Sequence, residues 1–138
     1  MALYRASSQQ KKRTKMQIVI AVLQIIAALG LLNVWLLRFH KSTPFRGGGA
    51  RSMREEFAVY GLPGWFTYLI GTLKVAVAIC LVAGLWLRFL VFPSALLLFV
   101  LMLGALAMHW KVRDPLKKSL PALVMLTVSI LICYISPR

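Results

Sequence analysis

A single charged side chain lies in the middle of a long apolar stretch. Lys74 is the one charge between Tyr60 and Val82, a run that opens with the turn Gly61-Leu62-Pro63-Gly64. About 20 apolar residues suffice to cross the roughly 30 Å hydrocarbon core of a bilayer. An ionisable group inside such a span costs roughly 2.5–3.5 kcal/mol on insertion scales and is by default a candidate functional site. Lys74 is therefore the first candidate for a ligand site or an ion pair.

Few counter-charges are available to this lysine. The sequence has three acidic residues, Glu55, Glu56 and Asp114, against 17 Lys and Arg. Glu55 is expected to complete a capping box with Ser52 at the start of a short helix, which leaves Glu56 as the free acid on or beside the inward face. We therefore predict a buried Lys74–Glu56 ion pair that holds the short helix over the bundle. The alternatives are that Lys74 extends to the membrane surface or that it binds a ligand.

Further polar side chains fall at the same end of the predicted bundle. Tyr60 ends the short helix, His109 lies at the end of the third span, and Asp114 precedes the last span. Together with Lys74 and Glu56 they form the predicted ligand or ion-pair site. Asp114 is also the expected N-cap of the last helix, because proline follows it. His109 is more typical of a hydrogen-bonded interface histidine than of a ligand, and no residue receives a catalytic role.

Other site chemistries find no support in the residue spacing. Cys80 and Cys133 both lie in apolar runs without a Cys-x-x-Cys pattern, which predicts buried thiols and neither a redox pair nor a metal site. His40 and His109 lack the paired helical spacing expected of a bis-histidine haem. The sequence has no nucleophile–base pair and no phosphate-binding loop. We therefore expect no cofactor, with a quinone as the alternative, and a protein that is more an accessory than an enzyme.

Composition places the whole chain in a membrane. Its 138 residues are 60% hydrophobic and 14% charged, whereas soluble domains are about 25% charged. The net charge of +14 could indicate nucleic-acid binding in a soluble protein. Here every Lys and Arg except Lys74 lies outside the apolar spans or at their ends, which is typical of anchoring to lipid headgroups. A lipid bilayer is the predicted environment, and no nucleic-acid partner is expected.

The apolar runs predict an all-α membrane protein, a bundle of four transmembrane helices with a short interfacial helix in the first loop. The four spans are expected at about 16–37, 65–87, 92–110 and 119–135. The loop helix is expected at about 53–60, after the flexible Gly47-Gly48-Gly49. Residues 1–15 carry several Lys and Arg and no acid, which predicts a disordered basic arm before a single transmembrane domain over 16–138.

Four spans would place both chain termini on the same side of the membrane. The positive charges are nearly balanced between the two sides, with Arg88 and Arg138 counted on the terminal side. The acid-free arm beside the first span favours a cytoplasmic location for both termini.

Several short motifs resemble those of a known family. They are Tyr60-Gly61-Leu62-Pro63, then Gly71 three residues before Lys74, then His109, and finally Asp114-Pro115-Leu116-Lys117-Lys118. Their order and spacing resemble the DoxX-like family of small four-helix membrane proteins, over about residues 53–135. This broad group also includes the nicotinic acetylcholine-receptor chaperone.

The resemblance implies a role beside other membrane proteins. The family's namesake is tied to a thiosulfate:quinone oxidoreductase, and other members are linked to redox complexes or receptor assembly. The expected function is a non-catalytic accessory, assembly or chaperone-type subunit of a membrane complex, with a membrane-protein partner or self-association. The membrane would be the bacterial cytoplasmic membrane in a prokaryote and the endoplasmic reticulum in a eukaryote.

Two alternatives remain open, and one departure from the family bears on them. A quinone-interacting subunit of a membrane oxidoreductase would bind the quinone near Lys74, Tyr60 and His109. A small transporter is the other alternative, although no acid lies within a span to couple it to protons. Members of the family commonly have Glu at the position of Lys74, and this reversal of charge suits an anionic ligand or an ion pair.

Overall fold

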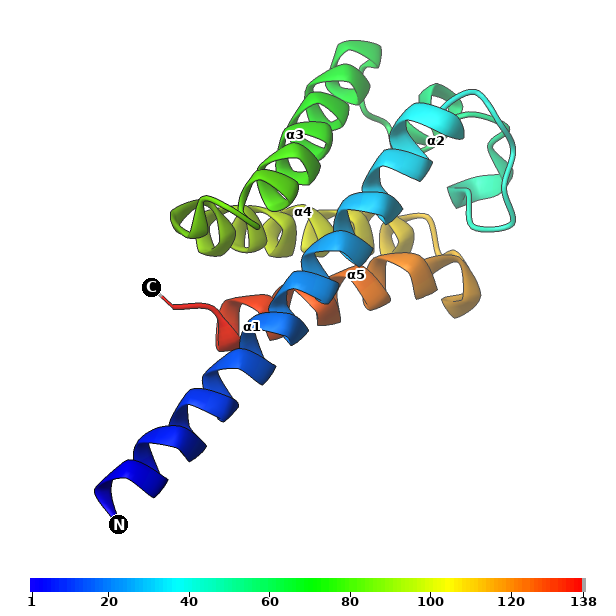
Figure 1. Ribbon diagram of the computed structural model, residues 1–138. Helices are drawn as coiled ribbons and strands as arrows, with labels where there is room; N and C mark the ends of the chain where they lie inside the picture. Colours follow the sequence, from blue (N-terminus) through cyan, green and yellow to red (C-terminus); the bar gives the residue numbers. More distant parts are fainter. Residues whose placement is uncertain (138) are drawn as a thin grey trace.

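The computed structural model describes residues 1–137, and within them four helices are long and apolar enough to span a membrane (Figure 1). These helices are α1 (Ala2–Leu32), which a π-helical turn extends over Asn33–Leu37, α3 (Gly64–Ala83), α4 (Val91–Lys111) and α5 (Leu116–Ile135). The first loop contains the short helix α2 (Met53–Val59) and a 3-10 turn over Gly47–Gly49, and a second 3-10 turn covers Arg88–Leu90. The described residues form no strand. The predicted all-α four-helix membrane fold is confirmed.

The loop helix α2 begins and ends where the sequence predicts. The Ser52 side chain accepts a hydrogen bond from the Glu55 backbone N–H at 3.2 Å and so caps the first turn. The Glu55 carboxylate accepts from the N–H of Arg51 at 2.8 Å, one residue earlier than in a standard capping box. Past the helix end, Gly61 has a φ of 79°, a left-handed conformation that glycine adopts without a steric penalty.

Small residues bring the spanning helices together. Ala27 and Ala28 of α1, Ala78 of α3 and Ala95 of α4 are all at most 1% exposed. Because lipid tails are as apolar as leucine, helices in a membrane associate through close packing, which small side chains permit. On α3, the side of Ala78 that faces protein also carries Lys74, whose side chain is buried. The prediction that this lysine faces the protein and not the lipid is confirmed.

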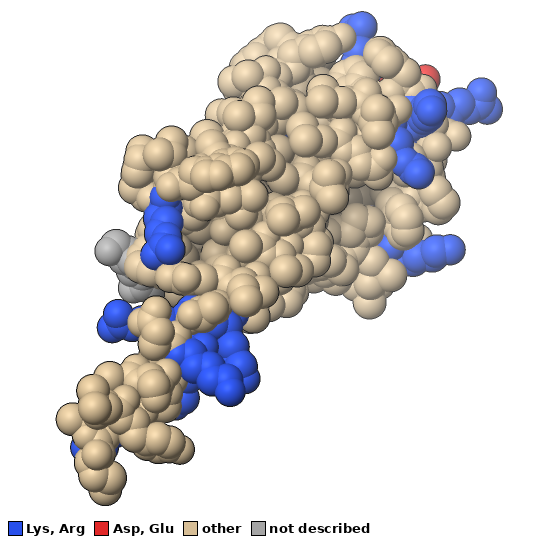
Figure 2. Space-filling view, in the orientation of Figure 1, with Lys and Arg blue, Asp and Glu red and all other residues tan. Residues whose placement is uncertain are grey.

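The N-terminal arm differs from its prediction. Residues 2–15 were expected to be disordered, but they are helical and extend α1 beyond the bundle (Figure 1). Adding turns to an existing helix avoids the cost of nucleation, and Ala, Leu, Gln, Lys and Arg are good helix formers. Figure 2 shows that Lys and Arg gather mainly toward the two ends of the molecule, with an uncharged surface between them. Arg138, counted above on the terminal side, lies outside the described residues.

Candidate functional site

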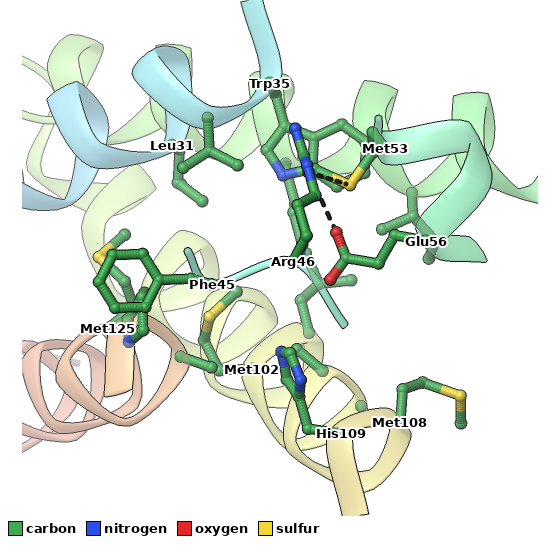
Figure 3. Close-up of a pocket in the computed structure, with 18 of the residues that line it drawn as sticks. Leu31, Trp35, Phe45, Arg46, Met53, Glu56, Met102, Met108, His109 and Met125 are labelled. Atoms are coloured by element: carbon green, nitrogen blue, oxygen red, sulfur yellow. Dashed lines mark hydrogen bonds and ion pairs between the residues drawn. The ribbon is translucent and has the colours of Figure 1, made fainter. Parts of the chain in front are cut away.

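Glu56 is the centre of a buried hydrogen-bond network. The network lies at the loop end of the bundle, which we define as residues 38–63 together with the turn 112–115 between α4 and α5. Arg46 Nη1 lies 3.0 Å from Glu56 Oε2, and this ion pair is drawn in Figure 3. The other carboxylate oxygen, Oε1, accepts from the N–H of Gly47 at 3.0 Å and from the Tyr60 hydroxyl at 2.7 Å. Three donors therefore hold one buried carboxylate.

Arg46 connects this network to the end of the first span. Its Nε donates to the carbonyl of Lys41 at 3.2 Å, its Nη2 donates to the carbonyl of Arg38, and its Nη1 also lies 3.2 Å from Met53 Sδ. The residue is only 4% exposed. A guanidinium presents five donors in a fixed planar fork, so it can bind a carboxylate and backbone carbonyls at the same time. Arg46 thus connects the first loop to the end of the first span and to α2.

The residue after Arg46 must be small for this arrangement to form. A Cβ placed on Gly47 would lie 2.4 Å from the Tyr60 hydroxyl oxygen. That distance is much shorter than any real carbon–oxygen contact, so a side chain here would push Tyr60 away from Glu56. Gly47 therefore serves the network both as a donor and as the space that Tyr60 occupies.

The predicted Lys74–Glu56 ion pair is wrong, because Arg46 takes the place of the lysine. Lys74 Nζ instead lies 5.0 Å from the centre of the Trp35 ring, a cation–π distance. Arg46 is one of several Lys and Arg in a loop that we expected to be flexible, and it received no predicted role. The sequence signal that could have suggested it is an arginine directly before a run of three glycines, ten residues ahead of Glu56. That signal does not specify a partner.

Asp114 forms the second half of the site and is not the helix cap that we predicted. Helix α5 begins at Leu116, with Pro115 as its N-cap residue. Asp114 Oδ2 lies 2.8 Å from His109 Nδ1, while Oδ1 accepts from the N–H of Gly48 at 3.0 Å and lies 3.8 Å from Lys118 Nζ. Helix α4 ends at Lys111, Arg113 has a left-handed φ of 54°, and the resulting turn brings Asp114 back to His109.

The surroundings of Asp114 and Tyr60 shift the pKa of each group in the direction that favours its hydrogen bonds. Burial acts to raise the pKa of Asp114, but the Gly48 hydrogen bond and the neighbouring His109 and Lys118 outweigh it and lower that pKa. Burial and the adjacent Glu56 carboxylate raise the pKa of Tyr60 far above its ordinary value. The Tyr60 phenol therefore stays protonated and remains a hydrogen-bond donor, while Asp114 stays ionised as an acceptor.

The hydrogen bonds of Glu56 and those of Asp114 are connected through the glycine turn and through a contact between two aromatic rings. The successive N–H groups of Gly47 and Gly48 donate to Glu56 and to Asp114, respectively. The Tyr60 ring meets the His109 ring edge-on, with the ring centres 6.0 Å apart. The structure thus brings together four of the five predicted site residues, all except Lys74.

A cavity of about 840 Å³ lies among the helices beneath this network. Lys74, Glu56, Tyr60 and His109 all line it, whereas Asp114 does not. The remaining wall is mainly apolar and comes from α1, α3, α4 and α5, as Figure 3 shows for several of these side chains, among them Leu31, Met102 and Met125. Ligand cavities of roughly 300–1,000 Å³ with apolar walls and few polar groups are typical of small-molecule sites. Lys74 therefore shares a cavity with the network without bonding to it.

No metal centre can be assembled from the residues that the structure describes. No group of three or more His, Cys, Asp or Glu within 1–137 is placed to hold an ion. Cys80 and Cys133 are not disulfide-bonded.

Comparison with known proteins identifies the family. A model of the DoxX-like family matches residues 45–132, a range that contains Arg46 and all five predicted site residues. An uncharacterized protein of Bacillus subtilis, YdgD, is 34% identical over 79 residues, which are 56% of this chain and 69% of that protein. No solved structure matches the chain. With its four apolar helices of spanning length, the chain is an integral membrane protein that belongs to the DoxX-like family.

Proposed function

We propose that this protein is a non-catalytic accessory subunit of a membrane assembly and that it holds an amphiphilic small molecule between its helices. The observation that carries the proposal is the cavity of about 840 Å³, which has apolar walls and a polar end formed by Lys74, Glu56, Tyr60 and His109. A molecule from the bilayer could place its chain against the walls and its polar head at that end. Polar groups that fix orientation in an otherwise apolar site are the usual arrangement in ligand cavities.

The hydrogen bonding of the polar end favours holding a molecule over transforming it. Arg46 bonds to two backbone carbonyls and to Glu56, while Glu56 accepts from Arg46, Gly47 and Tyr60. Asp114 is bonded to Gly48 and His109. These side chains position the first loop, so they are engaged with the protein itself and not directed at a reacting atom. A site of this kind binds and orients a molecule.

A protein partner, or a second copy of this chain, is proposed for the lipid-facing surfaces. The resemblance to members associated with redox complexes and receptor assembly is the basis for this part. Affinity capture of the tagged full chain from its native membranes tests it. A partner recovered in constant stoichiometry, or a stable oligomer of this chain, is the expected result, and a protein recovered as a lone monomer would contradict the accessory role.

A quinone is the second candidate for the molecule in the cavity. The observation in its favour is that Lys74 lines the cavity and has no hydrogen bond or ion pair among residues 1–137, so its ammonium can donate to a quinone carbonyl. The other two donors that we predicted are engaged, since the Tyr60 hydroxyl donates to Glu56 and His109 Nδ1 contacts Asp114. One of the three predicted contacts to a quinone thus remains free.

The ligand-holding role is tested by filling the cavity. Gly104 lines the cavity, and a Cβ added to it would meet no atom within 4 Å, so Gly104→Phe introduces a ring without a clash at its base. Leu103→Phe is the matched control, because Leu103 is 45% exposed and lies outside the cavity lining. The full chain would be extracted into polymer-bounded native-lipid discs and examined by native mass spectrometry.

The expected result is one amphiphile retained by the wild type and by Leu103→Phe but lost from Gly104→Phe. Equal retention by all three proteins, or retention by none, would contradict ligand holding in this cavity. A quinone as the retained molecule would select the second candidate.

A further inference from the structure

The cavity contains a buried cation, Lys74, that forms no direct ion pair with the residues that the structure describes. Lys74 is 9% exposed and lines the cavity. Its direct contact within the part of the chain that the structure describes is the cation–π contact with Trp35, at 5.0 Å from the ring centre, and Glu56 acts on it only through space, without a hydrogen bond or ion pair. An ammonium has three N–H donors, and a ring on one side leaves the other directions available. Burying a charge without a partner is costly, so this position calls for an acceptor.

The acidic side chains of the protein cannot supply that acceptor. Glu56 is occupied by Arg46, Gly47 and Tyr60. Asp114 is occupied by Gly48 and His109 and does not line the cavity. The third acid, Glu55, is exposed and accepts from the backbone of Arg51. These are all the Asp and Glu side chains in the sequence, so no acid of the protein is left to bond directly to Lys74, and an acid group of another molecule would fill that position.

The other charged side chains that line the cavity also favour an anionic ligand. Its lining includes the cationic side chains of Lys74, Arg46, Arg38 and Lys118, against Glu56 as the single acid. The Arg46–Glu56 pair neutralises itself at 3.0 Å. The positive charge that remains favours an anion over a neutral or cationic molecule of the same shape.

The position of Lys74 indicates what kind of anion can reach it. It lies ten residues after Gly64, the first residue of α3, which corresponds to a depth of roughly 15 Å at 1.5 Å per residue. Side chains such as Leu31, Met102 and Met125 form an apolar wall in the same cavity. A small hydrated ion would lose its water at this depth, whereas a molecule with a hydrocarbon chain is already soluble in the bilayer core.

We propose that the cavity binds an anionic amphiphile whose acidic head group, a carboxylate or a phosphate, pairs with the Lys74 ammonium while its hydrocarbon chain lies against the apolar wall. This rests on the proposed ligand-holding function and names the ligand class for that site. The Trp35 ring covers one side of the ammonium, and the anion takes the opposite side. A neutral ligand with the same chain would leave the charge of Lys74 uncompensated and would bind more weakly.

Three probes with the same hydrocarbon chain and different heads test this proposal. Oleate carries a carboxylate, oleoyl lysophosphatidate carries a phosphate, and oleyl alcohol is the neutral control. Their affinities for the full chain would be measured by isothermal titration calorimetry in a neutral detergent, with the shift in thermal unfolding as a second measurement. We expect at least one anionic probe to bind about tenfold or more tightly than oleyl alcohol, the size of one charge-assisted hydrogen bond. The tighter anionic probe identifies the source of the head group.

Substitutions at Lys74 locate the head group. Lys74→Met should weaken the anionic probe by about tenfold or more and leave oleyl alcohol unchanged, whereas Lys74→Arg, which keeps the charge, should retain a preference for the anion. Lys117→Met is the charge control, because Lys117 is an exposed lysine that does not line the cavity. The comparison of probes on the wild type does not depend on whether the Lys74 variants fold.

The outcomes separate this inference from the function on which it rests. Equal affinities of the wild type for oleate, lysophosphatidate and oleyl alcohol, all lost in Gly104→Phe, would overturn the anionic ligand and leave the ligand-holding cavity intact. Anion binding that Lys74→Met does not weaken would overturn the role of Lys74. No binding of any probe, together with no amphiphile in the native-lipid preparation, would overturn both proposals.

Discussion

The two ends of the helix bundle are held together by different kinds of interaction. At the hairpin end, which we define as the α3–α4 connection 84–90 and the side chains packed around it, α1, α3 and α4 meet through small and branched apolar residues, and Ala78, Leu81 and Ala95 are fully buried. At the loop end, the same helices surround a cavity, and charged hydrogen bonds centred on Glu56 and Asp114 hold the first loop across it. The hairpin end is held mainly by close packing, whereas the loop end combines an aromatic cluster around Trp35 and Phe57 with charged hydrogen bonds.

This difference follows from the physics of a bilayer. Lipid tails are as apolar as the side chains they touch, so burial of apolar surface provides no drive for helices to associate. At the hairpin end, small residues let the helices approach closely, and the closely packed atoms gain dispersion contacts that lipid tails do not provide. Helices that border a cavity cannot approach one another so closely there. At the loop end, bonds such as Arg46–Glu56 add to an aromatic cluster around Trp35 and Phe57 and hold the first loop beside the cavity.

The largest effect is expected where a single substitution strands a buried charge. Arg46→Met should destabilise the protein by about 3–5 kcal/mol, because it leaves the Glu56 carboxylate buried without its counter-charge. Adding Glu56→Gln to this variant should recover much of the loss, since the double variant buries no net charge. Thermal unfolding in detergent would measure both.

Arg51→Met is the matched control for this prediction. Arg51 is an exposed arginine of the same loop, so its replacement should change stability by no more than about 0.5 kcal/mol. Losses from Arg46→Met and Glu56→Gln that simply add in the double variant would show that the two side chains do not act as a pair. That result would contradict the interpretation that a charged pair distinguishes the loop end of the bundle from the hairpin end.

A smaller, pH-dependent effect is expected at Asp114. Its folded pKa lies below the ordinary value of about 4, so the ionised group stabilises the fold above that pH, and the stabilisation is lost as the pH falls through the lowered pKa. Asp114→Asn should cost about 1.5–3 kcal/mol near neutral pH, the range for hydrogen bonds to a charged group. It should also reduce the loss of stability on acidification that the wild type shows.

Thermal unfolding between about pH 3 and 7 would show this slope. Glu55→Gln is the control, since Glu55 is an exposed carboxylate outside the cavity. An acid slope in Asp114→Asn as steep as in the wild type would mean that another group carries the pH dependence.

The hairpin end could be predicted from the sequence because the patterns that determine its helices involve residues close together in the chain. Apolar runs of spanning length predict the four helices, and the charge within one of these runs led us to predict that Lys74 is buried in the protein. Those patterns depend only on positions along one helix. The structure confirms the fold and the burial of Lys74.

The loop end could be predicted only in part because its bonds join residues far apart in the sequence. Residues Glu56, Tyr60, His109 and Asp114 were chosen by type, and they do come together. Their partners were not predicted. The contacts of Arg46 depend on the conformation of a loop, which has no periodic sequence pattern. The donors of the glycine turn are backbone N–H groups, which every residue except proline has, so the residue types do not identify them.

The smallest effect is expected from Gln24, a buried polar side chain that is bonded across the hairpin end. Gln24 is 3% exposed, and its Nε2 donates to the carbonyl of Leu81 at 2.8 Å. That carbonyl lies in the last turn of α3, where the N–H of Leu85 bonds to Val82 and not to Leu81. Gln24 therefore satisfies a carbonyl that the helix itself leaves open.

Gln24→Met should cost about 1 kcal/mol, because methionine has nearly the same shape but cannot donate, and interhelical hydrogen bonds in membranes average roughly 0.6 kcal/mol. Thermal unfolding beside Gln10→Met, an exposed glutamine on the same helix, would isolate this loss. A loss as large as that from Arg46→Met would show that the hairpin end also depends on a directional bond. A small loss would mean that close packing of residues such as Ala78 is sufficient there, and that only the end containing the cavity needs charges to hold it.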